Sequence, residues 1–500
     1  MAKVERARKR VSIIEVNRKE IEANATRITE EEKCKNQKII DTGPRFGCRH
    51  VQAILLCLGL IFGIGTRTNL SVAIVAMTDN TTSPNPDVPA YSWTNTSVIL
   101  SSFFWSYITS QVLAGYLGKT YGPKYFLLTA FFINCVAVAL TPLAAAKMGS
   151  GGVILCRIIQ GFFQGFLYPS VHVMLGTWVP DEERATLSNF VFSGVAVGSM
   201  MSSILTGFIS ASSWGWPYSF YILALMGFLW CILWIIFGQN SPATHPRITD
   251  EEKKYIQSSL KQEEEIHLPI PWKKIFICLP FYAIFVAYVG NAWGYAILTT
   301  ETPTYLAKVM NFNVKSNALL SAIPMLVFLA AGFITGPLSD WIISRNYISR
   351  LNVRRYFQII GCYGQAVCLG WLSFLTESEA YTSIVCLSLG FAFAAFVLVG
   401  SSINHLDLSP RFSGILFGIL NATGQAASIM APLMAQWVII DQTSIMQWRI
   451  VFLTSAGFFV GGATVFFFFA TADRQSWDGP EDKNMEERRK KISVISLSAV

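Results

Sequence analysis

Charged residues are scarce in this 500-residue sequence: 14% are Asp, Glu, Lys or Arg, whereas 52% are hydrophobic and the mean hydropathy is +0.43. Soluble domains carry about 25% charged residues. A P-loop, a GxSxG motif and a HExxH motif are also missing, so ATP-driven pumping and peptidase chemistry have no support. We therefore expect a polytopic membrane protein that is not an enzyme and needs no cofactor.

Cysteine motifs and a secretory signal are lacking as well. The ten cysteines show no CxxC spacing, and most lie in apolar runs, as Cys57, Cys135, Cys231 and Cys386 do. We interpret them as small hydrophobic side chains and expect neither a disulfide nor a metal site. The long, charged amino terminus has no early apolar core, so the first membrane helix should serve as the insertion signal.

What the sequence has in abundance is apolar segments of about 20 residues, the length that crosses a bilayer. Six lie near 51–77, 98–117, 124–145, 152–178, 188–211 and 216–238, and six more near 276–300, 317–343, 356–375, 381–403, 411–437 and 448–471. They predict an all-α membrane protein with twelve transmembrane helices in two six-helix halves. The expected parts are a tail (1–50), the first half (51–238), a linker (239–275), the second half (276–471) and a second tail (472–500). A capping box from Thr249 to Glu252 predicts a helix in the linker.

The positions of Lys and Arg predict the orientation. They concentrate in the loops at 118–124, 181–184, 239–275 and 344–355, whereas the loops at 78–97, 212–215, 376–380 and 438–447 have none. Because cytoplasmic loops retain positive charge, we expect both tails in the cytoplasm. The net charge of +8 then needs no nucleic-acid partner. Sequons at Asn80 and Asn95 would lie outside and carry glycans. Neither tail has an acidic dileucine signal, which favours the plasma membrane over the lysosome, and we expect a monomer.

Two arginines lie inside apolar segments. Arg67 is deep in the first segment, where an unbalanced charge is costly, so it should face a cavity or a partner. Arg157 lies nearer a helix end, where a snorkelling side chain is a stronger alternative. At about 100° per residue, one face of the helix over 152–178 carries its polar residues: Arg157, Gln160, Gln164, Tyr168 and His172. Guanidinium groups suit carboxylate or phosphate, so we expect a small anionic solute between them.

Other polar residues near the helices are candidates for coupling or gating. His172 could carry a proton or act as a neutral hydrogen-bonding group, whereas Gln160 and Gln164 cannot ionise. Asp340, at a turn after the eighth helix, could cap a helix start or pair with Arg345 in a gate.

Further polar candidates lie in the second half. The segment that joins helix 10 to helix 11 contains His405, Asp407 and Arg411. Their position near the membrane interface favours a structural or gating role. Asn291 and Asn421 could line a cavity or form bonds between helices.

Four motifs carry a resemblance to a known family: RTNLSVA from Arg67, SFFWSY from Ser102, WVPDEER from Trp178 and NHLDLSPR from Asn404. Together they resemble the major facilitator superfamily and, within it, the anion:cation symporter family of sialin, the vesicular glutamate transporters and the sodium-phosphate transporters. The resemblance covers nearly all of residues 50–472. It implies alternating access with an anion bound between the halves, and Arg67 and Arg157 match the family's substrate-site arginines.

The departures from the family pattern narrow the expected function. Sialin-like members have glutamates where this chain has Gln160 and Gln164. Vesicular glutamate transporters have a histidine where this chain has Leu100 and an arginine where it has Asn291. The chain looks more like insect members described as inorganic phosphate cotransporters. We expect a secondary transporter of phosphate or small organic anions, with sodium as the coupling ion that the resemblance implies. A proton-coupled, sialin-like exporter of acidic sugars and a non-transporting membrane sensor remain the alternatives.

Overall fold

The structure, a computed structural model, describes residues 43–478 apart from 79–82, 94, 261–269, 302–304, 307, 311–313 and 442. Every regular element in this part of the chain is a helix. The first half contains α2 (Cys48–Thr78), α3 (Thr96–Tyr121), α4 (Pro123–Gln164), α5 (Leu167–Trp178), α6 (Arg184–Ser210) and α7 (Trp216–Phe237). The linker holds α8 (Asp250–Leu260) and α9 (Trp272–Ile277). The second half contains α10 (Leu279–Thr300), α12 (Val314–Ser344), α13 (Arg350–Leu372), α14 (Ala380–Val399), α15 (Ser401–Leu408), α16 (Ser413–Val438) and α17 (Ile445–Phe469).

Ten helical stretches of the described chain are long and apolar enough to cross a membrane. One of them, Pro123–Trp178, is 56 residues long and holds two spans, because the chain turns at Gly149 with φ 63° and ψ −147°. The 23-residue α13 is a further span that is less apolar, since it carries Arg354 and Arg355. The predicted twelve-span, all-α fold is therefore confirmed.

The fourth span of each half is broken. In the first half α4 ends at Gln164 and α5 starts at Leu167, because Pro169 has no N–H to continue the helical ladder to Gly165. In the second half the break falls at Gly400, between α14 and α15, with φ −77° and ψ −113°. In membrane proteins built from two repeats, interrupted helices at matching places point to a binding site near the middle of the membrane.

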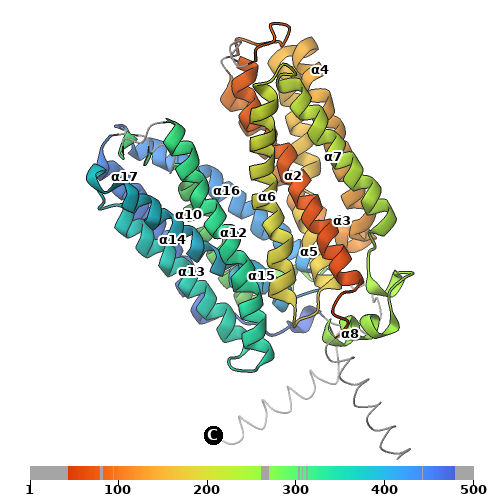
Figure 1. Cartoon of the computed structure of the whole chain (residues 1–500). Coiled ribbons are helices and arrows are strands. Elements are labelled where there is room, and N and C mark those ends of the chain that lie inside the picture. The colour runs from red at the N-terminus through yellow and green to blue at the C-terminus, as the bar shows by residue number, and fades with distance from the viewer. Residues whose placement is uncertain are drawn as a thin grey trace, which may run out of the picture.

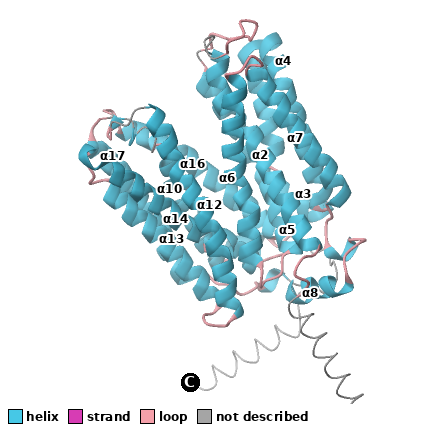
Figure 2. Cartoon of the chain, in the orientation of Figure 1, coloured by secondary structure: helices cyan, strands magenta, loops and turns pink. Residues whose placement is uncertain are grey.

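The two halves form two bundles that lie together at the end carrying α8 and diverge toward the opposite end (Figure 1). The same view coloured by secondary structure shows only helices and connecting loops (Figure 2). The halves touch through α3 with α16, α6 with α12, and α5 with both α15 and α16. The α3–α16 contact is close, since a Cβ added at Gly115 would lie 2.5 Å from the carbonyl oxygen of Gly414.

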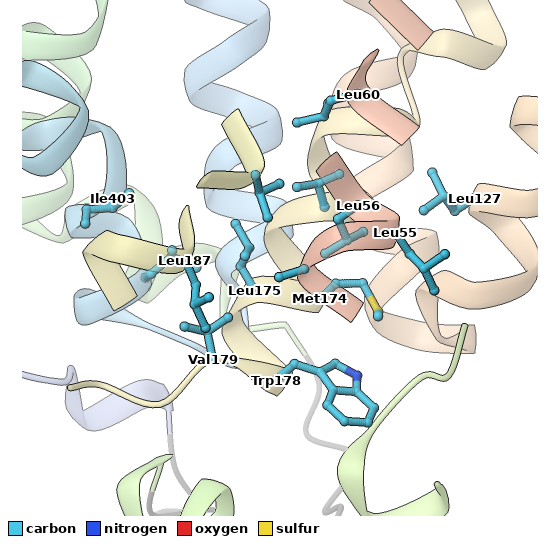
Figure 3. Packing of buried hydrophobic residues seen from close by; sticks show 14 of the residues in the cluster. Leu55, Leu56, Leu60, Leu127, Met174, Leu175, Trp178, Val179, Leu187 and Ile403 are labelled. Atoms are coloured by element: carbon cyan, nitrogen blue, oxygen red, sulfur yellow. The ribbon is translucent and has the colours of Figure 1, made fainter. Parts of the chain in front are cut away.

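A large apolar cluster fills the end where the halves meet (Figure 3). It draws side chains from α2, α4, α5, α6 and α15: Leu55, Leu56, Leu60, Leu127, Met174, Leu175, Trp178, Leu187 and Ile403. Ile403 comes from the second half, so part of the packing here forms only while the halves are together.

The linker helix α8 forms where the capping box predicts one. The Thr249 hydroxyl accepts a hydrogen bond from the Glu252 backbone N–H at 3.3 Å. The Glu252 carboxylate, however, reaches α2, where it accepts from the backbone N–H groups of Cys48 (2.9 Å) and Arg49 (3.0 Å) and from Arg49 Nη1 (3.2 Å). An anion at a helix amino terminus is favourable, so the linker caps the first membrane helix.

Both expected tails are partly folded, contrary to the boundaries drawn from composition. Arg49 is only 1% exposed and belongs to α2, although the sequence suggests a tail up to residue 50. Beyond residue 472, Trp477 and Asp478 are buried against the start of α16, where Asp478 binds the Ser409 hydroxyl. These contacts could not be predicted from the polar composition of the two segments, because each contact is made by only one or two residues.

Candidate functional site

Arg67 and Arg157 lie beside the same aromatic ring. The guanidinium carbon of Arg67 is 5.1 Å from the ring centre of Phe103, 4.8 Å from that of Phe104 and 5.4 Å from that of Tyr107. The guanidinium carbon of Arg157 is 4.8 Å from Phe103. Helix α3 thus provides an aromatic platform for two cations, one from α2 and one from α4, which is a favourable place for guanidinium groups inside a membrane.

Neither arginine forms an ion pair with an acidic side chain in the described part of the chain. Arg157 is 3% exposed and donates to Gln160 Oε1 (3.0 Å) and to the Arg67 carbonyl (3.3 Å), while its buried Nε has no partner. These neutral contacts leave the positive charge uncompensated. Two such guanidinium groups side by side can hold a carboxylate or a phosphate.

The residues of the polar face predicted for 152–178 lie on two helices, because α4 ends at Gln164 and α5 begins at Leu167. Gln160 and Gln164 share α4 with Arg157, and Gln164 Nε2 donates to the Gly63 carbonyl of α2. After the break, Tyr168 instead stacks between Phe192 of α6 and Phe417 of α16, with ring centres 6.3 and 6.2 Å away. Tyr168 and Arg67 still interact electrostatically, so the break does not remove Tyr168 from the neighbourhood of the arginines.

His172 meets the second half directly. Its Nδ1 lies 2.9 Å from Nε2 of His405 in α15, and both rings are buried. Phe417 stacks on His172 with ring centres 3.5 Å apart. The two histidines follow the breaks in the fourth spans of the two halves, so the broken helices place them against each other.

Asp407 is the centre of a buried charge cluster. Its carboxylate accepts from Arg184 Nη1 of α6 at 2.8 Å and from Arg354 Nε of α13 at 2.7 Å. Arg350 lies 3.9 Å from Asp407 and donates to Asp181 at 2.6 Å. The Arg184–Asp407 and Arg350–Asp181 pairs each join one half to the other. Because a buried carboxylate needs such partners, the cluster closes this end of the molecule.

Asp340 caps a helix of the opposite half. Its carboxylate accepts from the backbone N–H groups of Ala185 (3.2 Å) and Thr186 (2.6 Å) at the start of α6. Asp340 is expected from the sequence either to cap a helix or to pair with Arg345. The structure shows the helix cap, and the Arg345 side chain is exposed. Arg411 lies apart from the Asp407 cluster: its backbone N–H donates to Asp478 at 3.2 Å.

The remaining candidates are placed more simply. Asn291 is half-buried in α10, with no partner for its Oδ1 among the described residues. Asn95 is half-buried and donates to the Ser150 hydroxyl at 3.3 Å, and Asn80 lies outside the described residues. No group of three or more His, Cys, Asp or Glu side chains that could hold a metal occurs in the part of the chain described.

Sequence reasoning missed Arg184, Arg350, Arg354 and Asp181 as members of one cluster. The signal that could have found them is charge and position. Asp181 and Arg184 belong to the motif that begins at Trp178, and Arg350 and Arg354 lie in the first turns of α13.

Comparison with known proteins identifies the family. A sequence profile described as Major Facilitator Superfamily matches residues 56–432. The chain belongs to the Major Facilitator Superfamily. This protein is therefore a multi-pass membrane transporter and not an enzyme.

Within the superfamily, relatives of this chain match the anion:cation symporter family that its motifs resemble. A "Putative inorganic phosphate cotransporter" of Drosophila melanogaster is 36% identical over 463 residues, 87% of each chain. Sialin of Ovis aries is 33% identical over 451 residues, covering 86% of this chain and 90% of sialin. Vesicular glutamate transporter 2 of Homo sapiens is 31% identical, covering 88% of this chain and 77% of that protein.

Solved superfamily structures share the fold. The proton:xylose symporter XylE has a TM-score of 0.65 at 17% identity, covering 85% of this chain and 96% of XylE. The fucose:proton symporter FucP of E. coli has a TM-score of 0.61 at 13% identity, covering 83% of this chain and 98% of FucP.

Proposed function

We propose that this superfamily member is a secondary active transporter of anions, either inorganic phosphate or small organic anions, which it binds at Arg67 and Arg157. The observation that carries the proposal is the pair of guanidinium groups on one aromatic ring, with no acidic partner in the described chain. Charges inside a membrane protein are costly, and those that face its interior commonly mark a solute pathway. The names of the relatives, which include phosphate and glutamate transporters, agree with an anion.

We further propose sodium as the coupling ion. Gln160 and Gln164, which lie beside the arginines, bear no titratable proton. Uptake should then continue in the presence of a protonophore at fixed membrane potential, and should fall when choline replaces sodium.

The orientation and location of the carrier are part of the same proposal. We place both termini in the cytoplasm of a monomeric plasma-membrane protein, with glycans at Asn80 and Asn95, because basic residues gather in the loops on the side of the linker.

A second candidate, proton-linked anion export, is favoured by one observation: the buried histidine pair between the halves. A protonophore that abolishes uptake while sodium is unchanged, together with the same loss in His172→Gln, would support proton coupling and overturn sodium coupling.

The anion assignment is tested by uptake of labelled phosphate into proteoliposomes. Removal of one arginine should cost charge-assisted hydrogen bonds of about 1.5–3 kcal/mol, which is about a ten- to hundred-fold weaker apparent affinity. Arg67→Ala and Arg157→Ala should both show it, and Arg67→Lys should recover part of it, because lysine keeps the charge but loses the planar fork.

The matched control is Arg449→Ala. Arg449 also lies on an aromatic ring, 4.5 Å from Phe374, but belongs to α17, away from the two arginines. Normal affinity in Arg67→Ala, or an equal loss in Arg449→Ala, would overturn the assignment.

A further inference from the structure

A groove of about 320 Å³ lies between α2, α6 and α12, near the end of the molecule that carries α8. Figure 1 shows α6 between the other two helices in this region. Two of the residues that line the groove, Ile54 of α2 and Phe333 of α12, are 40% and 51% exposed. Because all three helices are long and apolar enough to cross a membrane, these side chains face hydrocarbon. The groove, which we call the lateral groove, therefore opens into the lipid.

The lateral groove is large enough for a ring system. An apolar cavity of about 150 Å³ binds benzene, so a groove of about 320 Å³ can hold about two such rings. The phenyl groups of Phe46, Phe190 and Phe333 line it, and a Cβ added at Gly332 would meet nothing within 4 Å. A rigid ring system loses less conformational entropy in such a groove than a flexible acyl chain does.

Asn189 of α6 gives the lateral groove a hydrogen-bond acceptor that lacks a donor. Its side-chain nitrogen donates to the Gly332 carbonyl at 3.2 Å and to the Thr335 hydroxyl at 3.3 Å, both in α12. Its Oδ1 is buried and has no partner among the described residues. A buried amide oxygen without a donor costs free energy, so a ligand that can donate a hydrogen bond is favoured at this wall of the groove.

His50 of α2 adds a donor to the lateral groove. Its Nδ1 accepts from the Gly47 backbone N–H at 3.2 Å, so Nε2 carries the hydrogen of the neutral ring. The ring is half-buried and stacks on Phe46, with ring centres 5.3 Å apart. A hydroxyl group can both accept, as His50 requires, and donate, as Asn189 requires, whereas ester and ionised phosphate oxygens only accept.

The buried charges beside the lateral groove already have partners. Arg49, the residue before His50, binds Glu183 at 2.7 Å and Glu252 at 3.2 Å. Asp340, near the end of α12, accepts from two backbone N–H groups at the start of α6 at 3.2 and 2.6 Å. A charged phosphate would find no free buried countercharge in either place, so the groove suits a lipid whose polar group is uncharged.

We propose that the lateral groove binds a membrane sterol, whose hydroxyl group lies at Asn189 and His50. The sterol rings lie along Phe190, Phe333 and Gly332. The bound sterol touches both halves, because α2 and α6 belong to the first half and α12 to the second. This inference goes beyond the proposed function, since the groove faces lipid and its residues take no part in the arginine site.

Binding of tritiated cholesterol to the purified full chain in detergent tests the proposal. Binding should be saturable, and unlabelled cholesterol should compete about three- to tenfold more strongly than its 3-keto analogue, which accepts hydrogen bonds but cannot donate one to Asn189. His50→Phe keeps the aromatic ring and loses the Nε2–H donor, so it should weaken cholesterol binding by about three- to tenfold as well.

A substitution that fills the lateral groove tests its location. Gly332→Leu should raise the Kd for cholesterol at least about tenfold, because the new side chain enters the space that the sterol rings need. Gly461→Leu is the matched control: Gly461 is an exposed glycine of α17 where an added Cβ also meets nothing within 4 Å. The Kd of this control should stay within about twofold of that of the unmodified protein.

Equal competition by cholesterol and its 3-keto analogue, or an unchanged Kd in Gly332→Leu, would overturn the proposal. Displacement of cholesterol by an equal concentration of phosphatidylglycerol would also overturn it, because the groove would then take a phospholipid. If Gly332→Leu does not accumulate, the comparison of the two sterols on the unmodified protein decides the matter. Phosphate uptake enters none of these measurements, so a failure of the proposed function would leave their outcome unchanged.

Discussion

Replacement of Asp407 by asparagine should favour separation of the halves at the end carrying the linker. Asparagine keeps the size of the side chain but removes the charge that Arg184 and Arg354 bind at 2.8 and 2.7 Å. Breaking a buried ion pair costs about 3–5 kcal/mol, because the remaining charge stays buried. Of the two short bonds that Asp407 accepts, only the one from Arg184 joins the two halves, because Arg354 belongs to the same half as Asp407.

About half of that cost, about 1.5–2.5 kcal/mol, should therefore destabilise the arrangement in which the halves are together. Separation relieves it, since Arg184 can then reach water. The ratio of separated to closed molecules should rise about ten- to seventy-fold. Double electron–electron resonance between spin labels at Tyr121 and Tyr347 measures that ratio, as the population at the shorter distance falls.

Asp441→Asn is the matched control, because this exposed carboxylate lies in the loop between α16 and α17 at the opposite end. It loses the same charge without touching the interface. An unchanged distance distribution in Asp407→Asn, or an equal change in Asp441→Asn, would show that Asp407 does not hold the halves together.

Three further outcomes can be checked separately. Glu252→Gln should lose about 1–3 kcal/mol of charge-assisted bonding to Arg49 and the start of α2, and limited proteolysis should then cut the linker sooner. Asp478→Asn should loosen the segment around Trp477, so that trypsin cuts after Arg474 faster than in the unmodified protein. In glycosylating cells, glycosidase should increase gel mobility, and the double variant Asn80→Gln and Asn95→Gln should abolish that change; no change in the unmodified protein would contradict the proposed orientation.

The helical fold could be predicted because it depends on local properties. A span needs a run of apolar residues of bilayer length, and a cap such as Thr249 lies three residues from the group that it satisfies. Arg67 and Arg157 could be singled out in the same way, since a charge in an apolar run is costly whatever surrounds it.

The contacts between the halves could not be predicted from one sequence. His172 and His405 are 233 positions apart, and Arg184 and Asp407 are 223 apart. Periodicity indicates which face of a helix is polar, but not which distant helix meets that face. The break near Pro169, which divides the predicted polar face between α4 and α5, also depends on more than the regular helical period.

The two guanidinium groups on Phe103 have an electrical consequence. With no acidic partner in the described residues, the site proposed for the anion carries two positive charges when empty, and a divalent anion bound with one coupled sodium ion would reduce that charge to one. The membrane voltage would then act more strongly on the unloaded carrier, at about 2.3 kcal/mol per charge per 100 mV for a full crossing. A negative interior would hold the unloaded site facing inward, so the resting potential would slow its return more than it affects the step that carries the anion.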